Sequence, residues 1–452
     1  MKKKLPAFLI TLAALAVLGA SLLPCRAQAA VSQIGFTPAS EAIDLVNLDT
    51  GMTVYEKNPT EKREPASTTK IMTYIIAVEQ IKDLQGTNIT VTKKTIDELS
   101  GTGSSMSGLE AGDVLSAYQL LNCMMVPSGN DAALVLAEYI GGGDSSKFID
   151  LMNAKAKKLG CTGTHFVNPH GLHDSNHYTT AADLVKITQY AMKLPYFMDI
   201  CSQLSYHCKL TGGPRAGTTL TLSTTNRMLI SSDQQYYYRY AKGIKTGHTD
   251  ESGYCLVSSA SADGYSYLCV ALGAPSVDKN GKDIDTHGEM LDSAQLFRWA
   301  LKSLKLKKVV SANDTLGEIN LNYAWKKDTL RLQAEKSFST ILPKDVSTSS
   351  IVVTKNVPKS IDAPVKKGQV IGTATLSYAN EKLATINLVA GESVERSELL
   401  RTTDAIKSVL TSKWFLITVA VIILLLIVYI ILAIVYNRKR KRLRKVKRYR
   451  KL

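Results

Sequence analysis

Two segments alternate apolar and polar residues around a turn signal, as the paired strands of a β-hairpin do. Residues 42–58 alternate around DTG, and residues 253–273 do so around ADG. Between them, residues 65–194 mostly show apolar positions three or four apart, as in SAYQLLNCMMV and NDAALVLAEYI, which is typical of helices. Residues 289–304 have the pattern of an amphipathic helix. Strands at both ends of residues 30–305 with helices between them predict an α/β domain. Its expected architecture is an antiparallel sheet flanked by helices.

The pattern changes at about residue 305 to short alternating segments separated by turn residues. These segments are LGEINLNYAW, DTLRLQAE, SSIVVTKNV, QVIGTATLSYA and KLATINLVA. Such spacing is typical of a small all-β domain, which we place at residues 306–397. No catalytic group of residues stands out in it, so we expect it to act as a spacer or docking domain. Residues 398–413 are expected to be a linker.

A run of 23 residues without a charge, residues 414–436, follows this linker. As a helix it would extend about 34 Å, enough to cross a hydrocarbon layer of about 30 Å. Trp414 and Tyr436 stand where interfacial aromatic residues belong, and the basic segment 437–452 should remain in the cytoplasm. The sequence therefore predicts a single transmembrane helix with the domains that precede it outside the cell.

The N-terminal segment, residues 1–29, has a cationic start, a short apolar stretch and the small-residue triplet Ala27-Gln28-Ala29, as a secretory signal peptide does. A retained N-terminal membrane helix is the alternative. The formal net charge is +16, but four basic residues lie in this segment and eleven in the C-terminal tail, which leaves about +1 elsewhere. A nearly neutral body gives no sign of a nucleic-acid partner.

Six cysteines remain after removal of the signal: Cys123, Cys161, Cys201, Cys208, Cys255 and Cys269. An exported protein can oxidise such an even set, but several of these cysteines lie in apolar runs, where buried free thiols are expected. No spacing of histidine and cysteine indicates a metal site, and neither a metal nor an organic cofactor is expected.

The segment PASTTKIMTY places a serine three residues before a lysine at the start of an apolar run. On a helix, Ser67 and Lys70 would share one face. A serine becomes a nucleophile when a neighbouring base takes its proton, and a lysine with a lowered pKa can be that base. Ser67 is thus the candidate nucleophile and Lys70 its base. Taken alone, the pair is better explained as a helix cap with a solvated lysine.

Two further motifs follow in the same chain. Ser128-Gly129-Asn130 stands at a turn that enters a helix, and Lys245-Thr246-Gly247 precedes a strand. Each alone fits a helix cap or an exposed strand end. Together and in this order, S-x-x-K, S-x-N and K-T-G match the active-site set of penicillin-binding proteins and serine β-lactamases.

The chain resembles the low-molecular-weight penicillin-binding proteins that are D-alanyl-D-alanine carboxypeptidases. The resemblance covers about residues 32–395 and includes the phrases GSSMSGLEAGDVLSAYQLLNCMMVPSGNDAA, HFVNPHGLHDSNHYTTAADL, TNRML and GIKTGHTDESGYCLV. It implies removal of the terminal D-alanine from peptidoglycan stem peptides through an acyl-enzyme, with β-lactam antibiotics as inhibitors. The implied partners are thus the stem peptide, β-lactams and the membrane.

The resemblance also implies roles for single residues. Ser67 would attack the peptide carbonyl, Lys70 would accept its proton and Ser128 would pass a proton to the leaving amine. Asn130 would bind the substrate amide, and Lys245 would bring positive charge near the substrate carboxylate.

The remaining implied contacts come from the K-T-G strand. Thr246 and Thr249 would donate hydroxyl hydrogen bonds, and Gly247 would let the strand approach the substrate. The backbone N–H of His248, with that of Ser67, would form the oxyanion hole.

Two positions stay open at this point. His170 lies in a loop that the resemblance puts beside the site, in a structural or a catalytic role. Related enzymes often carry an arginine after the strand YLCVALG, but here the stretch APSVDKNGKDIDTHGEM holds only Lys279, Lys282 and His287 as basic residues.

Two alternative functions share the motifs. A β-lactamase would need a second group for rapid hydrolysis of the acyl-enzyme, and no E-x-x-x-N-like segment lies between Asn130 and Lys245. A non-catalytic wall-binding or sensor protein would have no chemical reason to keep all the motif residues. The carboxypeptidase is the favoured prediction.

Overall fold

The computed structural model describes residues 34–449, so the predicted signal peptide lies outside the described part of the chain. The described chain divides into two compact units. The first runs to Val309 and includes Ser339–Val353 and Leu376–Ala384, and the second contains the rest. The predicted domain limits, including the one at 305/306, stay predictions.

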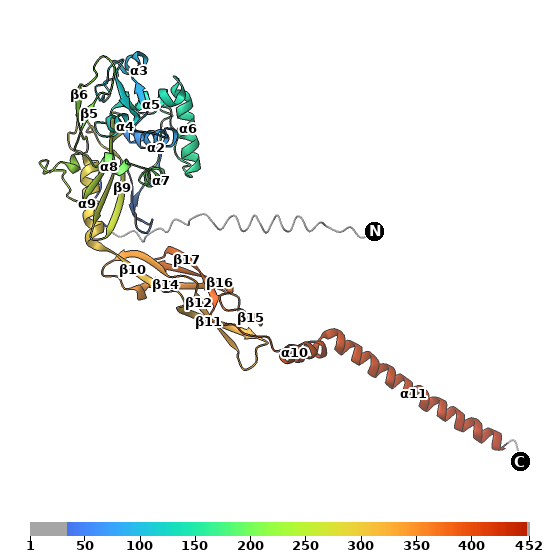
Figure 1. Ribbon diagram of the computed structural model, residues 1–452. Coiled ribbons are helices and arrows are strands. Elements are labelled where there is room, and N and C mark those ends of the chain that lie inside the picture. The colour runs from blue at the N-terminus through green and yellow to red at the C-terminus, as the bar shows by residue number, and fades with distance from the viewer. Residues whose placement is uncertain (1–33, 450–452) are drawn as a thin grey trace. The chain divides into compact units, whose positions relative to one another are not determined.

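An antiparallel sheet with the strand order β2-β1-β9-β8-β7 forms the centre of the first unit (Figure 1). Its strands are β1 (Ala42–Asn47), β2 (Thr53–Lys57), β7 (Ala241–Thr249), β8 (Gly253–Ala262) and β9 (Tyr265–Ala274). Asp263 and Gly264 connect β8 to β9 with φ angles of 52° and 79°. Two positive φ angles are what a two-residue hairpin turn requires. Both predicted hairpins are confirmed.

Helices and two small two-stranded sheets connect β2 to β7, and one long helix follows β9. The helices are α2 (Lys70–Gln80), α3 (Lys93–Leu99), α4 (Ala117–Met125), α5 (Asn130–Gly141), α6 (Ser145–Lys158), α7 (Ala181–Ala191), α8 (Phe197–Cys201) and α9 (Gly288–Ser303), with 3-10 helices η2 (Ala66–Thr69) and η3 (Arg227–Leu229). Strand β3 (Asn88–Thr90) pairs with β4 (Val114–Ser116), which follows α3 in the chain, and β5 (Ser205–Lys209) forms a hairpin with β6 (Thr219–Ser223). The predicted fold class is confirmed.

The central strand β9 is buried on both faces, because its alternate residues enter different cores. Leu268, Val270 and Leu272 pack in the core formed with α2, α4, α5 and α7. Tyr267 and Cys269 pack in the second core, which α9 closes with residues such as Phe297. A strand's side chains alternate between the two faces of its sheet, so one strand can serve both cores.

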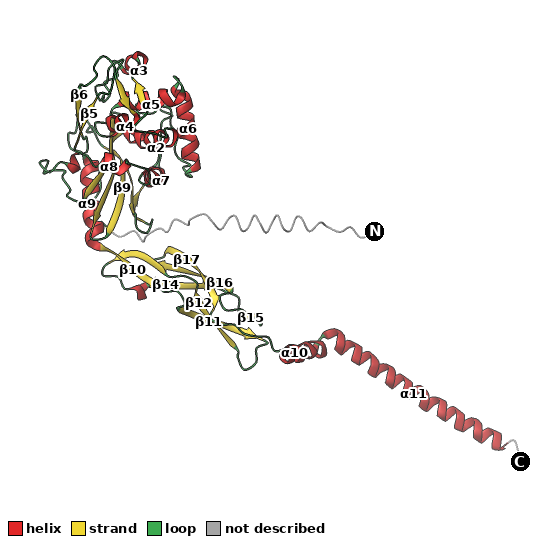
Figure 2. Cartoon of the chain, in the orientation of Figure 1, coloured by secondary structure: helices red, strands yellow, loops and turns green. Residues whose placement is uncertain are grey.

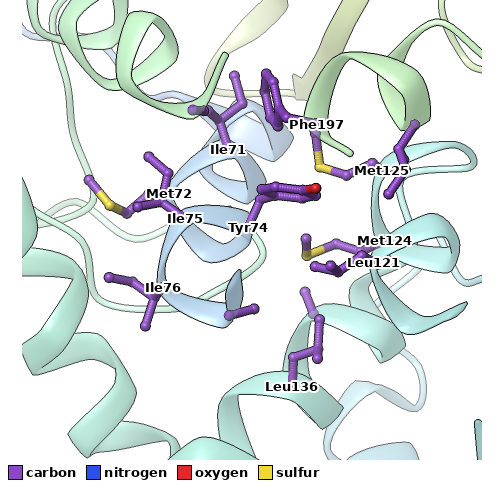
Figure 3. Close-up of a cluster of buried hydrophobic side chains, with 14 of the residues drawn as sticks. Ile71, Met72, Tyr74, Ile75, Ile76, Leu121, Met124, Met125, Leu136 and Phe197 are labelled. Atoms are coloured by element: carbon purple, nitrogen blue, oxygen red, sulfur yellow. The ribbon is translucent and has the colours of Figure 1, made fainter. Parts of the chain in front are cut away.

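Helix α2 lies inside the larger core and begins at Lys70, three residues after the predicted nucleophile Ser67. Figure 3 shows Tyr74 among apolar side chains of α4, α5 and α8. Its ring packs edge-on against Phe197, with centroids 4.9 Å apart, and its hydroxyl donates to the carbonyl of Pro195 at 2.7 Å. A helix that is apolar on all sides must be surrounded by protein, and this burial fixes the position of its N-terminus.

Between α9 and residue 397 the chain is largely β-structure, drawn as yellow arrows in Figure 2. Six strands form a sheet in the order β14-β16-β17-β12-β11-β15, and β10 pairs with β13. The strands are β10 (Leu304–Val310), β11 (Thr315–Asn322), β12 (Thr329–Ala334), β13 (Phe338–Pro343), β14 (Val352–Asn356), β15 (Ser360–Asp362), β16 (Val370–Tyr378) and β17 (Glu381–Ala390); a 3-10 helix, η4 (Thr348–Ser350), precedes β14. Each of the five segments predicted here contains a strand of the six-stranded sheet.

The predicted linker 398–413 is largely helical, because α10 occupies Glu398–Thr411. Ser397 caps its N-terminus by accepting a hydrogen bond from the backbone N–H of Leu400. Ser412, in an extended conformation, separates α10 from α11 (Lys413–Tyr449). The segment Lys413–Arg440 of α11 has the length and the apolar composition to cross a membrane, and an 18-residue window of it reaches a mean hydropathy of 3.4.

All six cysteines of the described chain are free thiols, and all are buried, as expected. The Sγ atoms of Cys123 and Cys208 lie 3.8 Å apart, the distance of a hydrogen-bonded pair of thiols. Burial raises the pKa of Cys255 and of Cys269 to about 12, so these thiols stay protonated and behave as apolar side chains.

Candidate active site

Ser67 lies in the 3-10 helix η2, one turn before α2 begins, rather than in α2 itself. The two threonines that follow it face elsewhere. Thr68 donates to the carbonyl of Pro65 at 2.6 Å, and the Thr69 hydroxyl lies 2.7 Å from Nε2 of His177. Of the three consecutive hydroxyls, that of Ser67 faces the cavity.

Lys70 is fully buried and connects Ser67 to two distant segments. Its Nζ lies 2.8 Å from Oγ of Ser67, 2.5 Å from Oδ1 of Asn130 and 2.8 Å from the carbonyl oxygen of His170. A carbonyl oxygen can only accept a hydrogen bond. A neutral amine therefore directs its two N–H groups to Asn130 and His170, which leaves its lone pair for the hydroxyl of Ser67.

The environment of Lys70 favours this neutral form. Burial is the main cause that lowers its pKa well below the usual value, and the positive charge of Lys245 lowers it further, against a smaller opposite effect of Asp131. Lys245 is buried as well, which lowers its own pKa to about 7. Two buried amines near one another, with few compensating charges, both lose protons more readily than in water.

The segment Ser128-Gly129-Asn130 forms a tight turn into α5. Ser128 has a φ of 69°, and the backbone N–H of Gly129 donates to the carbonyl of Cys123 at 3.1 Å. A Cβ on Gly129 would lie only 2.7 Å from that carbonyl oxygen, so the turn requires glycine. The turn directs Ser128 and Asn130 toward the cavity.

A buried carboxylate holds the loop on the other side of this turn. Asp131 accepts hydrogen bonds from the backbone N–H groups of Ser107 and Leu109 and from the hydroxyl of Ser107. The backbone N–H of Asn130 donates to the carbonyl of Ser105 at 2.8 Å. This network fixes Ser105 at the cavity wall.

Strand β7 is an edge strand of the sheet and passes directly beside Ser67. A Cβ on Gly247 would lie 2.9 Å from the backbone N of Ser67 and 3.0 Å from Cβ of Ala66. Only glycine therefore permits this approach. Next to it, the hydroxyls of Thr246 and Thr225 lie 2.5 Å apart, and Thr249 is held in a turn by Ser252.

Lys245 does not line the cavity, although its neighbours in β7 do. Its Nζ donates to the carbonyl oxygen of Thr246 at 2.8 Å, and its side chain is 1% exposed. Its charge therefore acts on Lys70 through the protein interior.

The three motifs open on one cavity of about 580 Å³ in the first unit. Residues of all three motifs line it: Ser67, Ser128, Asn130, Thr246, Gly247, His248 and Thr249. Several other residues line the cavity without a predicted role: Ser105, Gly171, Thr225, Tyr254 and Glu289. The phrases GSSMSG and TNRML, quoted for the resemblance, carry two of these positions, Ser105 and Thr225. Nothing in the local sequence distinguishes Glu289.

His170 contributes its backbone rather than its ring to Lys70. The ring is buried, accepts a hydrogen bond from the N–H of Leu172 at 3.3 Å and is neutral, because burial lowers its pKa to about 3. A contact made by a backbone carbonyl group cannot be predicted from the sequence, since every residue has a carbonyl group.

One group of possible metal ligands lies at the rim of the cavity within the described chain: Glu64, His173 and Glu251, with ligand atoms within 4.8 Å of one another. Nδ1 of His173 lies 2.9 Å from both carboxylate oxygens of Glu64 and 3.8 Å from Glu251. The hydrogen bond to Glu64 raises the pKa of His173. The three side chains therefore satisfy one another as an ion-paired group.

Comparison with known proteins agrees with this geometry. Residues 27–276 match the family described as D-alanyl-D-alanine carboxypeptidase, and residues 304–396 match the C-terminal domain of penicillin-binding protein 5. The chain is 27% identical over 353 residues to D-alanyl-D-alanine carboxypeptidase DacF of Bacillus subtilis, covering 78% of this chain and 85% of that protein.

Solved structures give the same result. The structure of penicillin-binding protein 5 from Haemophilus influenzae matches with a TM-score of 0.60 and 26% identity, over 81% of this chain and all of that chain. The DD-transpeptidase of Streptomyces K15 matches with a TM-score of 0.53 and 29% identity, over 59% of this chain and 98% of that chain. The chain belongs to the peptidase S11 family of D-alanyl-D-alanine carboxypeptidases.

Proposed function

We propose that the protein removes the terminal D-alanine of peptidoglycan stem peptides by a serine mechanism in which Ser67 is the nucleophile. The observation that carries this proposal is the contact between Nζ of Lys70 and Oγ of Ser67 at 2.8 Å, with both other Nζ contacts made to carbonyl oxygens. A neutral amine in this position can take the hydroxyl proton as Ser67 attacks the carbonyl between the two D-alanines.

The rest of the cavity supports the same reaction. The backbone N–H groups of Ser67 and His248, brought together by the close approach at Gly247, would donate to the oxyanion of the tetrahedral intermediate. Ser128 would pass the proton from Lys70 to the leaving amine, and D-alanine would depart. Water then attacks the acyl-enzyme, which releases the shortened peptide and restores the hydroxyl of Ser67.

Substrate contacts are assigned by position in the cavity. Asn130 would hydrogen-bond the substrate amide while its Oδ1 holds Lys70. Thr246 and Thr249 would donate hydroxyl hydrogen bonds to the terminal carboxylate. Lys245 would add positive charge from beneath β7. A β-lactam carries a reactive amide and a carboxylate in a similar arrangement, so it would acylate the same serine.

The test of this proposal is the release of D-alanine from a peptide ending in D-Ala-D-Ala, measured with the purified full chain in detergent. We expect steady release by the wild type and none by Ser67→Ala. The Ser67→Ala protein should show an unchanged unfolding temperature, because Ser67 is partly exposed at the cavity and its hydroxyl is not part of the core. Equal release by the two proteins would exclude Ser67 as the nucleophile.

The same proteins separate the two alternatives. A β-lactamase would turn over penicillin continuously, whereas the proposed enzyme should retain one acyl group per molecule for a long time. A non-catalytic sensor would release no D-alanine although penicillin labels Ser67.

We further propose that α11 crosses the cell membrane once, with the catalytic domain outside and the basic tail in the cytoplasm. A chain ending at Ser412 keeps α10, in which Asp404 accepts a hydrogen bond from the Tyr323 hydroxyl at 3.1 Å. We expect this truncated chain to be released from the membrane fraction and to hydrolyse a small peptide at the wild-type rate. Retention in the membrane fraction would show that α11 is not the anchor.

A further inference from the structure

The cavity lacks an obvious positive group for an anionic substrate. The proposed substrate ends in a carboxylate, but among the described residues that line the cavity none is a lysine or an arginine. Lys70 and Lys245 are buried and bonded to protein oxygens, and Lys279 and Lys282 are not lining residues. The lining side chains that can become positive are His173, His248 and His287.

These three histidines differ in their surroundings. His173 lies against the two carboxylates of Glu64 and Glu251, so its charge is already compensated. The ring of His248 is stacked on Tyr254 and has no carboxylate that would stabilise a second proton among its described contacts. His287 has one carboxylate partner, Glu289, with Nδ1 and Oε1 3.1 Å apart.

Glu289 is unusual because it is almost completely buried in the wall of the cavity. It is 1% exposed, and within the described structure its Oε2 has no hydrogen-bond partner. A buried carboxylate is stable when a positive group lies beside it. The only basic group in hydrogen-bond contact with it in the described chain is the ring of His287. Glu289 therefore holds the ring of His287 in place through Nδ1.

Stacking fixes where the ring points. His287 packs on Tyr254 with centroids 4.4 Å apart, and Tyr254 packs on His248 with centroids 4.6 Å apart. His248 precedes Thr249, one of the proposed carboxylate contacts on β7. Since Nδ1 of His287 faces Glu289, the nitrogen left for a ligand is Nε2.

We propose that His287, oriented by Glu289 through Nδ1, binds the C-terminal carboxylate of the substrate through Nε2; this rests on the proposed function. With Nδ1–H donated to Glu289, Nε2 carries a hydrogen only when the ring is positively charged. In that form it donates a charge-assisted hydrogen bond to an anion. His287 is thus a specificity-determining residue, and Glu289 is a positioning residue.

The proposal includes a pH dependence, because the ring loses its ligand hydrogen when it is deprotonated. The groups that face His287 are Glu289 from its own helix, Tyr254 from β8 and the ring of Tyr236, over which Arg227 lies at 4.3 Å. Asp283 and Asp285 lie in the preceding loop. Burial raises the pKa of Tyr254, and these acids with Glu289 raise it further, so Tyr254 stays neutral. Carboxylate binding should therefore weaken as the pH rises.

The experiment compares acylation of the full chain by benzylpenicillin and by its methyl ester, which lacks the negative charge. The quantity measured is the second-order rate constant for benzylpenicillin divided by that for the methyl ester. We expect His287→Gln to lower this ratio about 10- to 100-fold, as for loss of one charged hydrogen bond, and His287→Arg to restore most of it. Glu289→Gln, which keeps a partner for Nδ1, should lower the ratio less.

Lys282→Gln is the matched control, because it removes a charge from the same loop outside the cavity. We expect it to leave the ratio unchanged. An unchanged ratio in His287→Gln, or an equal fall in Lys282→Gln, would overturn the proposal.

A pH series gives a second readout. The ratio should fall more steeply with rising pH in the wild type than in His287→Arg, because arginine keeps its charge whereas Lys245, with a pKa of about 7, loses its charge in both proteins. The same pH dependence in both proteins would also overturn the proposal. Acylation by a penicillin does not involve release of D-alanine. A protein that shows the expected rate ratios but releases no D-alanine would therefore contradict the proposed function and leave the role of His287 in carboxylate binding intact.

Discussion

Lys70→Ala is expected to slow acylation of Ser67 by benzylpenicillin about a thousandfold, because loss of a general base typically lowers the rate about 10²- to 10⁴-fold. Nζ of Lys70 is the basic atom within hydrogen-bond distance of Oγ of Ser67 in the described structure. Without it the hydroxyl must lose its proton to water. The measurement is the rate of labelling by a fluorescent penicillin at several concentrations.

The variant must also be shown to fold. Alanine leaves Oδ1 of Asn130 and the carbonyl of His170 without their donor, which costs about 1–3 kcal/mol for each buried group that water does not reach. Thermal unfolding measures this loss separately from chemistry. Added methylamine, which can enter the space left by the side chain, should restore part of the labelling rate. Rapid labelling of a folded Lys70→Ala protein would exclude Lys70 as the base.

The same argument predicts how the wild type responds to pH. An ammonium has no lone pair, so acylation should slow as the pH falls through the pKa of Lys70. Burial and the charge of Lys245 lower this pKa well below that of a free lysine. Acylation should therefore stay fast at pH values where a lysine in water would be almost fully protonated.

Gly247→Ala is expected to reduce acylation about 100-fold, although it adds a single methyl group. The new Cβ would lie 2.9 Å from the backbone N of Ser67 and 3.1 Å from the carbonyl oxygen of Pro65. Backbone atoms cannot rotate away, so β7 or the Ser67 segment must shift by some tenths of an ångström. A misplacement of about 1 Å can cost about 10²-fold in rate.

Gly141→Ala is the matched control. A Cβ on Gly141, near the end of α5, would meet its nearest neighbours at 3.9 Å, an ordinary contact. We expect it to leave the labelling rate and the unfolding temperature close to those of the wild type. An unchanged labelling rate in Gly247→Ala would show that the close approach of β7 to Ser67 is not needed for acylation.

Local patterns were enough for much of the fold. The hairpin β8–β9 was predicted because two strands flank a turn with a glycine, and α9 because its apolar residues repeat at helical spacing. The short strands β3, β5 and β15 were not predicted. Strands of three to five residues contain too few alternations to differ from a loop, and pairing with distant segments stabilises them. The linker proved helical because Ser397 caps a segment of good helix formers.

The sequence alone determined which groups take part in the proposed chemistry, because a hydroxyl, an amine and a glycine have fixed properties and the three motifs keep fixed spacings. Only the tertiary structure decided their protonation states and contacts. Lys70 meets Asn130 and His170, which lie 60 and 100 residues away, and its burial next to Lys245 lowers its pKa. Glu289 and His287 likewise meet the cavity only because α9 packs against β8 and β9. Burial and electric fields depend on distance in space, which the order of residues does not contain.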